Sequence, residues 1–202
     1  MVRNGFVLAS KSPRRIALLR QLGFEFDVIP SEIGEDLIQG EPPHEHVIRL
    51  AEAKALEIGC RYPDRWIIAA DTVVFVNGSI LGKPKNEDEA FEMLSRLSGQ
   101  EHFVLTGVSA HHVRKGKGGR QTVQTAVKMK LLLPAEMRWY VNTGEPFDKA
   151  GGYAIQGIGA FMIESIKGSY TNVVGLPLYE LIQMLGDLGA LVISDRGFRI
   201  SD

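Results

Sequence analysis

Apolar and polar positions along the chain follow two periods that alternate over almost its whole length. Apolar runs with a strand-like pattern predict β-strands, and they span residues 6–9, 24–29, 66–76, 102–113, 121–133 and 158–166. Runs with helical periodicity predict helices, which lie between Ser12 and Gly23 and at 44–60, 87–97, 134–141 and 176–188. Alternating strands and helices are typical of an α/β fold.

Capping and turn residues support several of these boundaries. Ser12 is a suitable N-cap for the first helix, and Gly23 is a suitable stop. Asn77-Gly78 predicts a type I′ hairpin after the third strand. Asn86 predicts the start of the helix that follows it, with Glu89 at the reciprocal capping position.

The composition is that of an ordinary globular protein, since 45% of the 202 residues are hydrophobic and 23% are charged. We find no internal repeat and no linker between independent parts. The sequence therefore predicts one domain over residues 1–202. The Gly- and Lys-rich segment 114–120 is expected to be an exposed hairpin tip.

Three features bear on location and partners. The longest apolar runs are far shorter than a bilayer span, so no transmembrane helix is expected, and residues 1–5 lack the apolar stretch of a signal peptide. Cys60 is the only cysteine, which fits a reducing compartment such as the cytoplasm. A net charge of −1 gives no overall attraction to nucleic acid or membrane, so neither is expected as a partner.

The first candidate for chemistry is the segment Ser10-Lys11-Ser12-Pro13-Arg14-Arg15, where a strand gives way to a helix. Backbone N–H groups and the positive end of the helix dipole favour an anion there. Arg14 and Arg15 oppose the usual preference for acids in a first turn, but their guanidinium groups suit phosphate oxygens. A solvated helix start with surface cations explains the local sequence equally well.

Two ionisable residues stand within apolar patterns. Asp71 lies inside the buried strand at 66–76. A carboxylate there is costly unless it is paired or metal-bound, which favours a functional role over a hydrogen bond to a nearby turn. Lys54 lies on the apolar stripe of a helix, so its ammonium points into the interior or a cleft, although snorkelling at the edge of such a stripe is commoner. The other members of the stripe are Val47, Ala51 and Ile58.

Other charged residues could complete such a site. Lys83 follows Gly82, where the backbone can approach a ligand, and its ammonium could neutralise phosphate. Glu35 or Asp36 could join Asp71 in a Mg²⁺ site, because that ion binds a few carboxylates together with substrate oxygens. Acids in such a polar stretch are more usually loop surface.

The run from Gly144 to Gly157 combines glycines, the charged pair Asp148-Lys149 and the amide of Gln156. This amide offers the donor and the acceptor that reading a nucleobase edge requires. The histidines and Cys60 do not have the spacing of a zinc site. The chain also has no Walker A motif and no Rossmann glycine fingerprint.

Taken together, these segments resemble the Maf family of nucleoside triphosphate pyrophosphatases, and the match covers nearly the whole chain. Each motif is weak alone, whereas the ordered set is specific. The motifs are Leu8-Ala9-Ser10-Lys11-Ser12-Pro13-Arg14-Arg15, Ala70-Asp71-Thr72-Val73-Val74, Gly82-Lys83-Pro84, Leu97-Ser98-Gly99, Asp148-Lys149-Ala150-Gly151-Gly152-Tyr153 and Asn172-Val173-Val174-Gly175-Leu176-Pro177. The resemblance implies a mixed twisted sheet with flanking helices, in two lobes around a cleft and related to the inosine triphosphatases, and it suggests a homodimer.

Within the family, the chain resembles the branch that acts on dTTP and UTP, on the basis of Arg14, Thr72 and Gln156. The resemblance implies a hydrolase that uses Mg²⁺ or Mn²⁺ and releases pyrophosphate. It also implies that Asp71 and Glu35 bind the metal and that Asp71 acts as general base or orients the attacking water. The substrate-binding residues implied are Ser10, Arg14, Arg15, Lys54, Thr72, Lys83 and Gln156.

One departure from the family pattern is Gly34, which stands in place of an acid near the expected metal ligand. Two alternatives stay open at this point. A non-catalytic, nucleotide-binding regulator, for instance of cell division, would bind nucleotide without turnover and would be indifferent to Asp71→Asn. A phosphohydrolase of the same fold would release orthophosphate instead of pyrophosphate.

Overall fold

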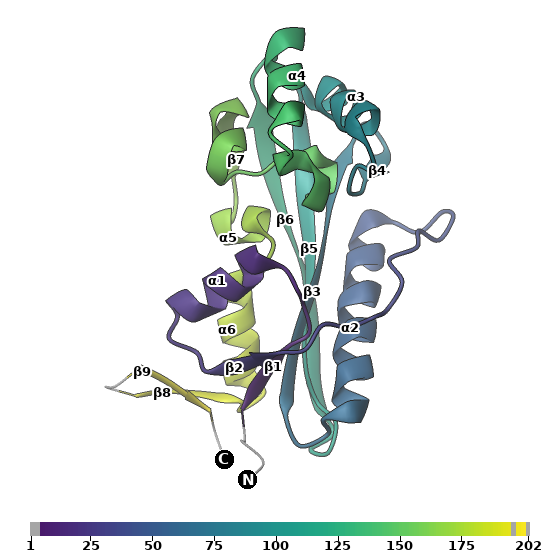
Figure 1. Cartoon of the computed structure of the whole chain (residues 1–202). Coiled ribbons are helices and arrows are strands. Elements are labelled where there is room, and N and C mark those ends of the chain that lie inside the picture. The colour runs from purple at the N-terminus through teal and green to yellow at the C-terminus, as the bar shows by residue number, and fades with distance from the viewer. Residues whose placement is uncertain (1–4, 195–196, 201–202) are drawn as a thin grey trace. The chain divides into compact units, whose positions relative to one another are not determined.

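The structure is a computed structural model that describes residues 5–194 and 197–200 (Figure 1). Strands and helices alternate along it, which confirms the predicted α/β class. The strands are β1 (Phe6–Leu8), β2 (Phe26–Val28), β3 (Trp66–Val76), β4 (Ser79–Leu81), β5 (Glu101–His112), β6 (Lys117–Met129), β7 (Ile163–Lys167), β8 (Leu191–Ser194) and β9 (Gly197–Ile200). The α-helices are α1 (Pro13–Gln21), α2 (Pro43–Arg61), α3 (Glu87–Leu97), α4 (Pro134–Asn142), α5 (Tyr170–Val174) and α6 (Leu178–Asp187). Short 3₁₀ helices are η1 (Glu145–Asp148), η2 (Ala150–Gly152) and η3 (Gly157–Met162).

The main sheet is mixed, as the family resemblance implies. Its seven strands follow the order β2-β1-β3-β5-β6-β7, with β4 paired to β3. β1 runs parallel to both β2 and β3, so that Phe6 lies opposite Phe26 on one side and Trp66 on the other. β4 and β7 pair antiparallel with β3 and β6. β8 and β9 form a separate antiparallel pair.

The chain forms two compact units. Unit 1 contains residues 1–71, 106–123 and 175–202, and unit 2 contains residues 72–105 and 124–174. The long strands β3, β5 and β6 contribute residues to both units, and in β3 the division falls between Asp71 and Thr72. The candidate residues of the sequence are therefore divided between the units.

The core of unit 1 is built on β1 and α2. All of β1 is buried, which is usual for a strand between parallel neighbours. α2 packs very closely on the backbone of β5, because a Cβ atom at Gly107 would lie only 2.2 Å from the Val47 carbonyl oxygen. Only glycine allows this approach. One buried cluster in this core consists of Val7, Ala9, Ala55, Ile58, Ile67 and Ala69.

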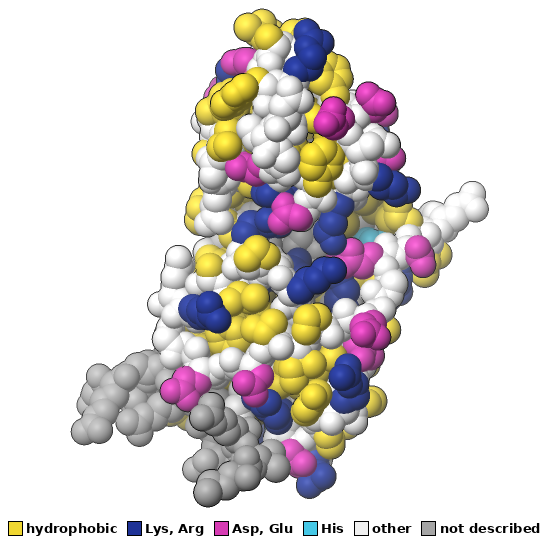
Figure 2. All heavy atoms as spheres, in the orientation of Figure 1, with side chains coloured by type: hydrophobic (Ala, Val, Ile, Leu, Met, Phe, Trp, Pro, Cys, Tyr) yellow, Lys and Arg dark blue, Asp and Glu magenta, His cyan; other side chains and the backbone are white. Residues whose placement is uncertain are grey.

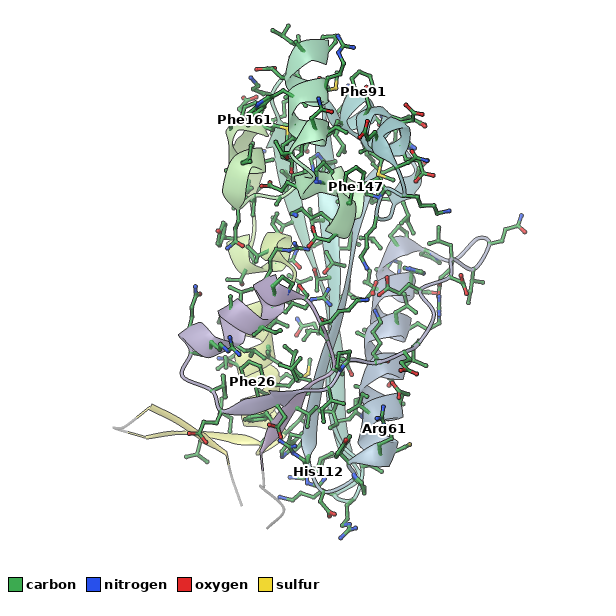
Figure 3. All side chains as sticks on the ribbon, in the orientation of Figure 1. Phe26, Arg61, Phe91, His112, Phe147 and Phe161 are labelled. Carbon is green, nitrogen blue, oxygen red and sulfur yellow. The ribbon has the colours of Figure 1, made fainter. Side chains whose placement is uncertain are left out.

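The core of unit 2 lies beneath α3 and α4, with Leu94 and Tyr140 fully buried. Phe91 and Phe147, both labelled in Figure 3, pack against it. Outside this core, the surface mixes charged and apolar side chains (Figure 2), and Trp139 is one of the exposed apolar residues. No helix in residues 5–194 and 197–200 is long and apolar enough to cross a membrane.

The strongest local signals of the sequence are confirmed. β3 and α3 have the predicted bounds. Asn77 and Gly78 both have positive φ, 48° and 76°, as a type I′ turn requires. Asn86 caps α3 by accepting a hydrogen bond from the Glu89 N–H. The Glu89 carboxylate, however, accepts from the Lys85 N–H and not from Asn86, so the reciprocal half of the predicted capping box is wrong.

Other predicted boundaries are wrong. Residues 157–162 form η3 rather than the first part of a strand, and β7 begins only at Ile163. β6 begins at Lys117, so much of the expected hairpin tip at 114–120 is strand. α6 is shorter than the predicted helix at 176–188, and α5, β8 and β9 were not predicted. A short apolar run cannot by itself distinguish a strand from a buried helix, which explains the error at η3.

Candidate active site

The start of α1 has the predicted form but a different cap. Ser12 is the N-cap, yet its side chain makes no capping hydrogen bond. Its N–H instead donates to the Ser10 hydroxyl at 3.2 Å. Pro13 opens the helix, and its first turn contains no acid. Arg14 and Arg15 therefore occupy a helix start whose electrostatics favour an anion.

Arg15 is held in place by the backbone of unit 1. Its Nε donates to the Gly175 carbonyl oxygen at 2.7 Å, and its Nη1 donates to the Ala70 carbonyl oxygen at 2.8 Å and to the Ser10 hydroxyl at 3.3 Å. Burial lowers the pKa of Arg15, and the nearby carboxylates of Asp71 and Glu35 raise it in part. Arg15 thus ties α1 to the segment that carries Asp71.

Lys54 and Asp71 form the centre of the site in unit 1. The Lys54 ammonium donates to Asp71 Oδ1 at 2.7 Å and to Glu35 Oε1 at 2.6 Å. Both Lys54 and Asp71 have side chains that are only 8% exposed, whereas that of Glu35 is 48% exposed. The apolar stripe predicted for this helix is buried, but Lys54 does not snorkel to water. The buried Lys54 ammonium is therefore paired with two carboxylates, which offsets the cost of burying its charge.

The segment that carries Glu35 is anchored by residues that no sequence motif indicates. Arg49 on α2 donates to both carboxylate oxygens of Glu41, at 2.5 and 2.7 Å, and to the Asp36 carbonyl oxygen at 3.3 Å. The buried His46 ring lies 2.9 Å from the same carboxylate. The hydrogen bonds from Arg49, more than those from His46, lower the pKa of Glu41 to about 2. The spacing from 41 to 49 carries no known motif, so only the fold reveals this anchor.

Three predicted site residues belong to unit 2. Thr72 follows Asp71 directly in β3 and is half-buried. Lys83 is exposed just after β4, and the preceding Gly82 accepts a hydrogen bond from the Gly151 N–H at 2.9 Å. Gln156 is the half-buried N-cap residue of η3. The structure thus brings Ser10, Arg15, Glu35, Lys54 and Asp71 together in unit 1 and fixes the local setting of the other three in unit 2.

The donor atoms in unit 1 suit a hard divalent cation. Asp71 and Glu35 each direct a carboxylate oxygen at the Lys54 ammonium. The two carboxylates together attract positive charge to the space between them. Within residues 5–194 and 197–200 there is no group of three or more His, Cys, Asp or Glu residues that could hold a metal. Mg²⁺ does not require one, because it commonly uses one or two carboxylates together with substrate phosphates. Asp36, the alternative to Glu35, contributes a carbonyl oxygen to Arg49.

An α/β fold that presents arginines at a helix start beside a buried cluster of lysine and carboxylates defines a class of protein that can bind a polyanion and activate water next to it. The profile of a family described as Maf-like protein matches residues 5–188. The chain belongs to the Maf family.

Curated relatives match over almost the whole chain. A protein of Syntrophus aciditrophicus named dTTP/UTP pyrophosphatase is 50% identical over 98% of this chain and 98% of its own. Proteins with the same name from Syntrophotalea carbinolica and Geobacter sulfurreducens are each 48% identical, over 96% and 95% of this chain and 90% and 100% of their own. The Ham1 protein of Staphylococcus aureus matches structurally with a TM-score of 0.43 and 18% identity, over 78% of this chain and 79% of that one. The family assignment rests on the sequence matches alone.

Proposed function

We propose that this protein hydrolyses dTTP and UTP to the nucleoside monophosphate and pyrophosphate. Relatives with 48–50% identity over nearly the full length carry that activity in their names. The observation that carries the proposal is the Lys54 ammonium bound to both Asp71 and Glu35 within unit 1. Such a charged cluster in a buried setting is costly to maintain and is commonly kept for chemistry.

In this proposal, Asp71 takes the proton from the water that attacks the α-phosphorus. Asp71 lies in β3, and Lys54 donates a hydrogen bond to its Oδ1 at 2.7 Å. This hydrogen bond restricts the side-chain rotamer and so fixes the direction of the other carboxylate oxygen. Arg14, Arg15 and Ser10 offer donors to phosphate oxygens at the helix start. These groups offset the negative charge that grows on the phosphates during the reaction.

Thr72, Lys83 and Gln156 have proposed roles that come from unit 2. The Lys83 ammonium would neutralise phosphate charge. Thr72 and the Gln156 amide would contact the pyrimidine base, because hydroxyl and amide groups can each donate and accept. Arg14, Thr72 and Gln156 are also the residues on which the resemblance to the dTTP and UTP branch rests.

We further propose Mg²⁺, or Mn²⁺, as the cofactor, held by Asp71 and Glu35. When bound, the metal would supply positive charge to the triphosphate oxygens. The hard oxygen donors of the two carboxylates fit this choice, whereas no sulfur or imidazole ligand is involved in the cluster. Lys54 would continue to balance the charge of the two carboxylates.

We also propose that the protein acts in the cytoplasm as a homodimer with nucleotide, rather than nucleic acid or membrane, as its partner. Cys60 is an exposed free thiol, which suits a reducing compartment. The near-neutral net charge offers no general attraction to polyanionic surfaces. Light scattering at several protein concentrations tests the dimer, and a monomer at all of them would contradict it.

A hydrolysis panel tests the function. Common and methylated nucleoside triphosphates are incubated with and without Mg²⁺, and pyrophosphate and phosphate are detected separately. Release of pyrophosphate from dTTP and UTP, but not from the other nucleoside triphosphates, supports the proposal. Release of phosphate would instead favour a phosphohydrolase. Tight nucleotide binding without turnover would favour a non-catalytic regulator.

A further inference from the structure

The start of η3 is capped by a residue from another helix. Glu145, in η1, accepts hydrogen bonds from the Ile158 N–H at 3.0 Å and from the Gly159 N–H at 2.9 Å. The first N–H groups of a helix have no partner within it, and the side chain of the N-cap residue commonly accepts one of them. The N-cap residue here is Gln156, whose side chain makes no capping hydrogen bond. Glu145 therefore does the capping in its place.

Two further contacts fix the position of Glu145. The buried Tyr140 hydroxyl donates to Oε1 at 2.9 Å, and the Lys149 ammonium donates to the Glu145 carbonyl oxygen at 2.5 Å. Burial raises the pKa of Glu145, but the hydrogen bonds from Gly159, Ile158 and Tyr140 outweigh burial, and the net pKa is lowered. The carboxylate is therefore ionised at neutral pH, and each of these hydrogen bonds to it is charge-assisted.

Two glycines follow closely after Gln156, and a side chain at either position would meet neighbouring atoms at short distance. Gly157 has φ of 74°, and a Cβ atom there would lie 2.8 Å from a carboxylate oxygen of Glu145. A Cβ atom at Gly159 would lie 2.8 Å from the Tyr140 hydroxyl. Gly157 thus allows the Glu145 carboxylate to approach the chain after Gln156, and Gly159 allows the approach of the Tyr140 hydroxyl.

We propose that Glu145 is a positioning residue for base selectivity, because it caps η3, fixes the backbone of Gln156 and leaves the Gln156 amide available to the base. This inference rests on the proposed function, in which Gln156 contacts the pyrimidine. Uracil and thymine present a carbonyl at C4 where cytosine presents an amino group. A site that reads this difference by hydrogen bonds discriminates strongly only when its polar groups are held in position.

The first experiment compares Glu145→Gln with Glu136→Gln. Glu136 is a matched control in the same unit, since its carboxylate also accepts a backbone N–H, that of Leu133 at 2.8 Å, and also binds a lysine. We expect Glu145→Gln to lower the ratio of kcat/KM for dTTP to that for dCTP by about tenfold, mainly through a higher KM for dTTP. We expect Glu136→Gln to leave the ratio unchanged. An unchanged ratio in folded Glu145→Gln would overturn the proposal.

A double-mutant cycle with Gln156→Ala separates positioning from general damage. If Glu145 acts through Gln156, then Glu145→Gln causes no further loss of selectivity in the Gln156→Ala background. Additive losses would show that Glu145 acts by another route and would also overturn the proposal. Failure of the proposed function is distinguishable from failure of the Glu145 proposal, because the wild-type protein would then hydrolyse neither dTTP nor UTP.

Should Glu145→Gln fail to fold, Tyr140→Phe provides the decisive variant. It removes one donor to Glu145 and keeps the buried ring, so the carboxylate is held by the two backbone N–H groups alone. The same ratio of dTTP to dCTP is expected to fall, by less than in Glu145→Gln. A wild-type ratio in Tyr140→Phe would then count against the proposal.

Discussion

The two units bury polar groups in different ways. Unit 1 contains a largely buried charged cluster: Lys54 binds Asp71 and the half-exposed Glu35, and Arg15 lies among backbone carbonyl oxygens close to the same carboxylates. Unit 2 buries a neutral pair, since burial lowers the pKa of His102 to about 4 while its Nε2 lies 2.6 Å from the Tyr153 hydroxyl. A buried charged cluster costs desolvation free energy that a neutral hydrogen-bonded pair largely avoids. In the proposed function, Asp71 and most of the phosphate-binding groups belong to unit 1, whereas unit 2 contributes Lys83 and the residues that contact the base.

The largest effect is expected from Asp71→Asn in unit 1. The amide keeps the size of the side chain and can still accept a hydrogen bond from Lys54, but it cannot take a proton. We expect kcat with dTTP to fall by about 100- to 10,000-fold in a protein that remains folded. Pyrophosphate release and a thermal unfolding curve measure the two quantities. A near wild-type rate would remove Asp71 from the mechanism and break the assignment of chemistry to unit 1.

The next effect is on stability and contrasts a buried lysine with an exposed one. Lys54→Met leaves the carboxylates of Asp71 and Glu35 without their cation, which should lower the free energy of unfolding by about 3–5 kcal/mol. The control is Lys130→Met in unit 2, because the Lys130–Glu136 pair has side chains that are 37% and 28% exposed. Exposed pairs contribute at most about 1 kcal/mol. Urea unfolding at neutral pH measures the free energy of unfolding of both variants. Equal losses in Lys54→Met and Lys130→Met would contradict the expected difference between the buried and the exposed lysine.

The contrast between units also separates what the sequence could predict from what it could not. Asp71 and Lys54 each stood out because an ionisable group interrupted an apolar pattern, so both could be found before the structure. Their contact could not be predicted, because it joins α2 to β3 across the fold. Glu145 gave no such signal, since a glutamate in a Gly- and Pro-containing loop is ordinarily surface. Its role appears only when η1 and η3 are brought together.

The same reasoning explains the errors in secondary structure. β3 and α3 were predicted well because their hydrophobic patterns agree with turn and capping residues at their ends. η3 was predicted as strand because Ile158, Phe161 and Met162 form an apolar run whose period is ambiguous over so short a length. A Cβ atom at Gly159 would lie 2.7 Å from the Ala154 carbonyl oxygen, and the local sequence does not reveal this close approach.

A pH dependence is expected from the neutral pair in unit 2. The pKa of His102 is about 4 in the folded protein because burial disfavours its charged form, against an ordinary value near 6.5 in the unfolded chain. Between these values the unfolded chain binds more protons, so the stabilisation is complete above about pH 6.5 and is lost as the pH falls toward 4. The loss should reach roughly 3 kcal/mol.

Burial also lowers the pKa of His111 and His112, so the contribution of His102 must be isolated. His102→Asn removes its titration and keeps a polar side chain near Tyr153. Unfolding free energies of both proteins are measured by denaturant titration from pH 7 to pH 4. The wild-type protein should lose more stability on acidification than His102→Asn. Parallel curves would mean that His102 is not the source of the pH dependence and that its pair with Tyr153 is not neutral.

The smallest effect is expected at a helix cap that has no role in the site. Asn86→Ala removes the side chain that accepts the Glu89 N–H at the start of α3, which should lower the free energy of unfolding by about 1 kcal/mol. Neither kcat/KM for dTTP nor the selectivity against dCTP should change, because α3 carries none of the proposed site residues. The variant thus measures what a purely structural loss in unit 2 does to the enzyme. If Asn86→Ala relaxed base selectivity as Glu145→Gln is expected to, selectivity would depend on the general stability of unit 2, and the specific link from Glu145 to Gln156 would lose its support.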